Sequence, residues 1–143
     1  DASTAGMQPD GTLAFVPGDA SNGSQPRVVA AAYTYNKVDE KITTNYAIDA
    51  ASGTLLMQGS RERTAPAVSP NAGRLTTVGS LRVKPFDHAS FDIADVSNAA
   101  FAALDRGGDR ESRWYEIDLA TGAARFIGTI GAGEPVVGVA VEP

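Results

Sequence analysis

Cysteine is absent from this chain of 143 residues, and histidine and tryptophan occur once each, as His88 and Trp114. The absence of cysteine excludes disulfide bonds, thiolate metal sites and cysteine nucleophiles, and it leaves the cellular compartment undecided. A single imidazole cannot form the centres of two or three histidines that hold transition metals. We therefore expect no function that depends on such groups.

Long hydrophobic runs and clusters of basic residues are also missing. Apolar runs such as residues 28–33 are far shorter than the roughly 20 residues that a membrane-spanning helix needs. The formal net charge is −5 and the isoelectric point is near 4.7, with the basic residues scattered along the chain. A scattered set of cations does not match a phosphate backbone. We expect no membrane-spanning segment and no nucleic-acid partner.

Glycine and proline are plentiful, with 15 and 8 residues, which favours an all-β fold of short strands and tight turns. One phrase occurs twice: Tyr-Ala-Ile-Asp-Ala-Ala-Ser-Gly at residues 46–53, and Tyr-Glu-Ile-Asp-Leu-Ala-Thr-Gly 69 residues later, at 115–122. We expect Asp49 and Asp118 to bind turn amides and the two glycines to supply a positive φ. A repeated unit of this kind is stable only when neighbouring units cover its apolar faces.

The repeat predicts the four-stranded antiparallel blades of a β-propeller, because four short strands in about forty residues match one blade. We expect a blade at 28–82 with a long loop at 59–73, a second blade at 83–131, and partial blades at 1–27 and 132–143. The expected strands are residues 28–34, 43–49, 54–58 and 75–81, then 90–93, 99–104, 113–118 and 123–130, and finally 135–141 as the opening strand of a further blade.

Three local features refine this layout. Residues 75–81 match residues 124–130 at an offset of 49 instead of 69, which predicts an insertion of about 20 residues in the first copy, within the loop 59–73. The alanine-rich residues 98–104 have some helix propensity, but the repeat favours a strand there. The N-terminal partial blade is expected to be an outer hairpin with a turn at residues 4–6.

Two blades and two partial blades are too few for a closed ring, because propellers normally have four or more blades. An incomplete array exposes edge strands, and pairing with protein covers them. We therefore expect a non-enzymatic module for assembly or protein binding, which completes its ring with other copies or with a partner chain. A lectin-like propeller that binds a small ligand or a glycan is the alternative.

Two motifs carry a resemblance to a known family. They are Val-Ala-Ala-Ala-Tyr-Thr at residues 29–34 and the Tyr-x-Ile-Asp-x-x-Ser/Thr-Gly phrase, and the likeness covers nearly the whole chain. The chain resembles an uncharacterised bacterial family of domains of unknown function, built from secreted, propeller-like repeats. The resemblance implies a secreted, periplasmic or cell-surface location and a match to the C-terminal portion of longer members. It implies no catalytic residue, since the family has no established enzymatic activity.

Carboxylates raise the question of a metal site. Asp87, Asp92 and Asp95 offer oxygen ligands that would suit Ca²⁺, although their spacing is not that of a calcium-binding loop. Asp92 lies on an expected inner strand, where an aspartate more often caps backbone amides. We expect no resident cofactor, with these three residues as the candidate calcium ligands.

Other polar residues suggest catalysis or ligand binding. Asp87 and His88 with Ser90 resemble the parts of a hydrolase triad, but adjacency in sequence is not triad geometry and no Gly-x-Ser-x-Gly turn is present. Candidate residues for a ligand or partner are two arginines in the long loop and an adjacent arginine and tryptophan on an expected strand, namely Arg61, Arg63, Arg113 and Trp114.

Overall fold

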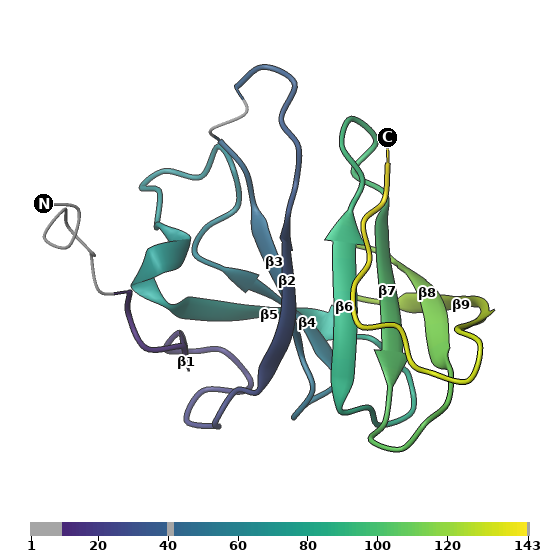
Figure 1. Cartoon of the computed structure of the whole chain (residues 1–143). Helices are drawn as coiled ribbons and strands as arrows, with labels where there is room; N and C mark the ends of the chain where they lie inside the picture. The colour runs from purple at the N-terminus through teal and green to yellow at the C-terminus, as the bar shows by residue number, and fades with distance from the viewer. Residues whose placement is uncertain (1–9, 40–41, 143) are drawn as a thin grey trace, which may run out of the picture.

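The computed structural model describes residues 10–39 and 42–142, and this part of the chain is all-β, as expected (Figure 1). Its elements are the strands β1 (Ala14–Phe15), β2 (Val28–Tyr33), β3 (Asn45–Asp49), β4 (Thr54–Gln58), β5 (Arg74–Ser80), β6 (His88–Ile93), β7 (Ala100–Asp105), β8 (Ser112–Ile117) and β9 (Ala124–Ile130), and one 3₁₀ turn, η1 (Pro70–Ala72). They form a five-stranded sheet in the order β1-β5-β4-β3-β2 and a four-stranded sheet in the order β6-β7-β8-β9.

Each sheet contains four consecutive strands that pair antiparallel with their neighbours in sequence, β2 to β5 in the first and β6 to β9 in the second. The expected strands between residues 28 and 130 are all present, with ends that differ by at most two residues. The alanine-rich segment is strand β7, not a helix. Its Ala100, Ala102 and Leu104 alternate into the core, which stabilises a strand more than helix propensity would stabilise one isolated turn.

The repeated phrase forms the same turn twice. The amide of Gly53 donates to the carbonyl of Asp49 at 2.9 Å, and that of Gly122 donates to the carbonyl of Asp118 at 2.8 Å. Both glycines have a positive φ, 66° and 77°, so the expected turn roles are confirmed. The two turns occupy different places, however. One joins β3 to β4 in the middle of the first meander, and the other joins β8 to β9 at the end of the second.

The second sequence match identifies a bulge in the last strand of each meander. In the β4–β5 pair the register shifts between Leu55 and Leu56, next to Gly79. In the β8–β9 pair it shifts between Trp114 and Tyr115, next to Gly128. Strand β9 therefore corresponds to β4 in the turn that precedes it, and to β5 in the bulge that it contains. The extra residues of the first copy accordingly comprise strand β4 together with the loop 59–73, which corrects the expectation that they lie in the loop alone.

The two sheets pack face to face around one shared core, and β2 and β6 lie side by side (Figure 1). The fully buried members of this core come from both sheets and from the connection between them, and they include Ile48, Leu55, Leu81, Ala102 and Leu104. The backbone of Leu81 links the sheets, because its amide donates to Gly53 at 2.9 Å and its carbonyl accepts from Ala124 at 3.2 Å.

Side chains also tie the two sheets at opposite ends of β2. The amide side chain of Asn98 accepts from the Tyr35 backbone N–H at 2.7 Å and donates to the Tyr35 carbonyl at 3.0 Å. Near the start of β2, the Arg27 guanidinium lies 3.4 Å from the Asp87 carboxylate. The relative placement of the sheets is therefore fixed by polar contacts as well as by the core.

The N-terminal segment covers the outer side of the first sheet. Strand β1 pairs in parallel with β5, and Phe15 is buried against Ala47, Leu56 and Leu75. The described part of 1–27 thus adds one short strand to the first sheet, and the outer hairpin expected around a turn at residues 4–6 lies largely outside the described residues, so it stays a prediction.

Asp19 fastens this segment further, since its carboxylate accepts from the Thr77 N–H at 2.7 Å and from its hydroxyl at 2.9 Å. Partial burial opposes ionisation of Asp19, but the hydrogen bonds from Thr77 and Ser21 outweigh it and lower its pKa below the ordinary value.

The C-terminal segment, residues 131–142, crosses the second sheet without forming a strand, which corrects the expected opening strand at 135–141. Its amides bind side chains: Val136 N–H donates to Ser112 Oγ at 2.9 Å and Val141 N–H to Asp92 Oδ2 at 2.7 Å. A strand requires backbone pairing with a neighbouring strand, and none of the described strands pairs with this segment. No helix in the described ranges is long and apolar enough to cross a membrane.

Candidate functional site

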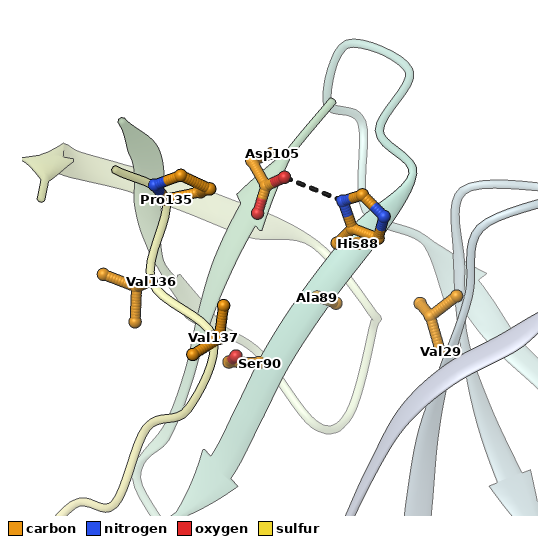
Figure 2. Close-up of a pocket in the computed structure, with 8 residues that line it drawn as sticks. All are labelled: Val29, His88, Ala89, Ser90, Asp105, Pro135, Val136 and Val137. Carbon is orange, nitrogen blue, oxygen red and sulfur yellow. Dashed lines mark hydrogen bonds and ion pairs between the residues drawn. The ribbon is translucent and has the colours of Figure 1, made fainter. Parts of the chain in front are cut away.

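A pocket of about 410 Å³ opens over β6, and we call it the β6 pocket. Figure 2 shows its eight lining residues, which come from β2, from β6 and β7, and from the C-terminal segment. Val29, Ala89 and Val136 contribute aliphatic walls, and His88, Ser90 and Asp105 contribute the polar side chains. The volume and the mixture of apolar walls with a few polar groups are typical of small-molecule sites.

His88 and Asp105 form the polar end of the pocket. They lie directly opposite each other in the β6–β7 register, and His88 Nδ1 is 2.9 Å from Asp105 Oδ1 (Figure 2). The Asp105 side chain is only 4% exposed, whereas that of His88 is 67% exposed. The buried carboxylate therefore orients an imidazole that solvent and ligands can reach.

The same carboxylate connects the pocket to the C-terminal segment. Ser112 Oγ lies 3.4 Å from Asp105 Oδ2, and this hydroxyl also accepts the Val136 N–H. Ser112 is fully buried, so this chain of contacts is shielded from water. The segment that closes one side of the pocket is thus held by the residues that hold His88.

This geometry is not a hydrolase triad. The carboxylate that contacts His88 is Asp105, which the sequence-based hypothesis did not include, and Ser90 lies two residues along the same strand with no hydrogen bond to His88 among the described residues. Asp87 instead accepts from Gly107 N–H at 3.2 Å and pairs with Arg27. The hydrogen bond from Gly107, together with Arg27, lowers the pKa of Asp87.

Asp87, Asp92 and Asp95, the candidate calcium ligands, have separate environments. Asp92 binds the Val141 amide, as expected of an aspartate that caps backbone, and Asp95 is exposed in the turn after β6. Within residues 10–39 and 42–142, no three His, Asp or Glu side chains gather in a way that could hold a metal ion. The calcium hypothesis gains no geometric support.

The four candidate binding residues do not converge on one site. Arg61 and Arg63 are exposed and border a depression of about 390 Å³ at the long loop. Arg113 lines a different depression and lies 3.7 Å from Asp109. The alternative of ligand or glycan binding through these residues stays a prediction.

Trp114 lies on the outer face of the second sheet, the side opposite the shared core. Tyr115 is part of the core, so its neighbour Trp114 points the other way, as does Phe101 between the core residues Ala100 and Ala102. The rings of Phe101 and Trp114 stack with centroids 5.5 Å apart and planes 7° from parallel. Both side chains are half-buried. The outer face therefore presents an aromatic pair beside the C-terminal segment.

Comparison with protein families finds one match: a domain of unknown function, DUF4394, aligns with residues 1–140. The chain belongs to the DUF4394 family. The expected membership of an uncharacterised domain family is thereby confirmed. Comparison of this DUF4394 domain with curated proteins and with solved structures found no match.

The DUF4394 domain thus has two features on the outer face of the second sheet, the β6 pocket and the stacked pair Phe101 and Trp114. Sequence reasoning singled out Trp114, His88 and Ser90 but missed Asp105. Asp105 could have been found from the register of the β6–β7 hairpin. Pairing residues outward from its turn places Asp105 opposite His88.

Proposed function

We propose that this DUF4394 domain is an extracytoplasmic β-propeller-type module for assembly or protein binding, whose ring is completed by other copies or by a partner chain. In this proposal β2–β5 and β6–β9 are two blades. Their antiparallel meanders, the face-to-face packing and the contact between the first strands β2 and β6 support the assignment, because propeller blades pack in this way around an axis. The extracytoplasmic location rests on the family resemblance.

The difference between the two outer sides of the molecule carries the proposal. On the first sheet, the N-terminal segment buries Phe15 in an apolar cluster. On the second sheet, the C-terminal segment crosses without strand pairing, and its Val137 is 95% exposed. Backbone groups without strand pairing and apolar side chains exposed to solvent favour association with another β-sheet.

The outer face of the second sheet is therefore the proposed contact surface. Its stacked Phe101 and Trp114 offer apolar area with little side-chain entropy to lose, which suits the centre of a protein interface. The adjacent Glu116–Arg125 ion pair is exposed and would lie at the rim. A protein that presents a β-sheet or an edge strand would match this surface.

Native mass measured across a range of concentrations, with the denatured mass of every chain present, tests the proposal. We expect a stable multimer or a tightly held second polypeptide. Val137→Asp should abolish the association, because it places a charge on an apolar contact surface. Val38→Asp is the matched control, since Val38 is a valine that is 85% exposed and lies outside this face.

A lone monomer at every concentration, with no second polypeptide, would contradict assembly. Equal loss of association in the Val137→Asp and Val38→Asp variants would contradict the assignment of the face. Circular dichroism of both variants separates loss of contact from loss of fold.

A further inference from the structure

The β6 pocket has a chemistry that assembly does not use. Its polar end contains one imidazole and one buried carboxylate, and the rest of its wall is aliphatic, from Val29 on one side of β6 to Val136 and Val137 on the other (Figure 2). This combination selects a ligand with an apolar body and one polar head.

The tautomer of His88 follows from its partner. An ionised carboxylate only accepts hydrogen bonds, so the short contact with Asp105 requires the proton of the neutral imidazole to be on Nδ1. The other nitrogen, Nε2, then carries a lone pair. In Figure 2 it lies on the side of the ring away from Asp105, toward Val29. The pocket therefore offers a hydrogen-bond acceptor to an incoming donor.

The charge of the site favours a cationic donor. The Asp105 carboxylate is buried, and among the described residues it contacts the His88 ring and the Ser112 hydroxyl but no arginine or lysine. Arg27, the cation of the neighbouring β2 end, is engaged by Asp87 and by the Phe86 carbonyl. A ligand carboxylate at Nε2 would face a hydrogen-bond acceptor and be repelled by the charge of Asp105 behind the ring, whereas an ammonium group would donate to Nε2 and be attracted by that charge.

We propose that the β6 pocket binds a small primary ammonium compound with an aliphatic body. Its head donates a hydrogen bond to His88 Nε2 and is attracted by the Asp105 carboxylate, and its chain lies between Val29 and the valines of the C-terminal segment. The pocket residues do not include the stacked pair Phe101 and Trp114, although both lie on the outer face of the second sheet and the pocket shares Val137 with the proposed contact surface.

The only histidine of the chain makes a direct test possible, because its imidazole signals in an NMR spectrum need no assignment. The full chain, labelled with ¹⁵N and ¹³C, is titrated with hexylammonium, hexanol and hexanoate, which share one aliphatic body. Hexylammonium should shift the His88 Nε2 resonance saturably. Hexanol should bind about tenfold more weakly, and hexanoate should leave the resonance unchanged.

A variant separates the site from non-specific binding. His88→Gln replaces an exposed side chain, and ligand-observed NMR should show binding of hexylammonium at least about tenfold weaker than to the native chain. Lys84→Gln, an exposed substitution outside the pocket, should bind as the native chain does. Equal shifts by hexanoate or hexanol, no shift by any probe, or full binding by His88→Gln would each overturn the proposal.

Discussion

At the residue scale, the repeated phrase contains two aspartates, Asp49 and Asp118, that contribute unequally to the stability of the fold. Asp49 is buried, and its carboxylate accepts from the backbone N–H groups of Arg27 at 2.6 Å and Ser52 at 3.1 Å. Asp118 is exposed and binds only its own turn, with Ala120 N–H at 2.8 Å. That hydrogen bond, together with the Thr121 hydroxyl, lowers the pKa of Asp118. Only Asp49 joins its turn to the segment that precedes β2.

Asp49→Ala should destabilise the protein by about 2–4 kcal/mol, because it removes a buried carboxylate that accepts several backbone hydrogen bonds at once. Asp118→Ala removes the matching turn residue and should cause a clearly smaller loss, since water replaces its acceptor. Urea unfolding of both variants measures the difference. Equal losses would show that the turn itself, and not the link to Arg27, is what matters.

At the element scale, the last strands of the two meanders share a bulge but differ in their surroundings. A Cβ at Gly79 on β5 would lie 2.1 Å from the carbonyl oxygen of Thr121, in the β8–β9 turn. A Cβ at Gly128, the matching position on β9, would meet no atom within 4 Å. The glycine of β5 is required by close packing between the sheets, and that of β9 is not.

Gly79→Ala should therefore cost about 1–3 kcal/mol, as overpacking against backbone does, whereas Gly128→Ala should change stability by no more than about 0.5 kcal/mol. Midpoints of thermal unfolding compare the two variants with the native chain. A Gly79→Ala variant as stable as Gly128→Ala would mean that the two sheets adjust their separation freely.

At the scale of the whole molecule, the shared core makes the two sheets one cooperative unit. Leu81 lies in the connection between them, is fully buried, and bonds through its backbone to both. Neither sheet retains this buried surface when the other unfolds. The two sheets should consequently unfold together.

Leu81→Ala should lower the free energy of unfolding by about 2–5 kcal/mol and should lower the stability of both sheets equally. Trp114 is the only tryptophan and lies on β8, so its fluorescence follows the second sheet while far-UV circular dichroism follows both. The two signals should coincide in urea before and after the substitution. Val38→Ala, at an exposed site, is the control; separated transitions would contradict the shared core.

Local patterns accounted for much of this fold. Turn chemistry around Asp49 and Asp118 and the alternation of apolar residues located the strands and both turns correctly. The placement of the repeat was less secure, because β9 has the turn of β4 and the bulge of β5, and short-range patterns do not distinguish these two alignments. The opening strand expected at 135–141 failed for a related reason, since a strand depends on a partner that its own residues do not encode.

The amino-acid sequence by itself determined the all-β class, the approximate positions of the strands between residues 28 and 130 and the roles of the turn residues, because each of these depends on neighbours within a few positions along the chain. Only the tertiary structure decided that Asp105 holds His88, that Asp92 binds Val141, and that Gly79 meets Thr121. Asp105 and His88 lie 17 positions apart in the chain, Asp92 and Val141 lie 49 apart, and Gly79 and Thr121 lie 42 apart. The register of the strands and the packing of the sheets bring these residues together.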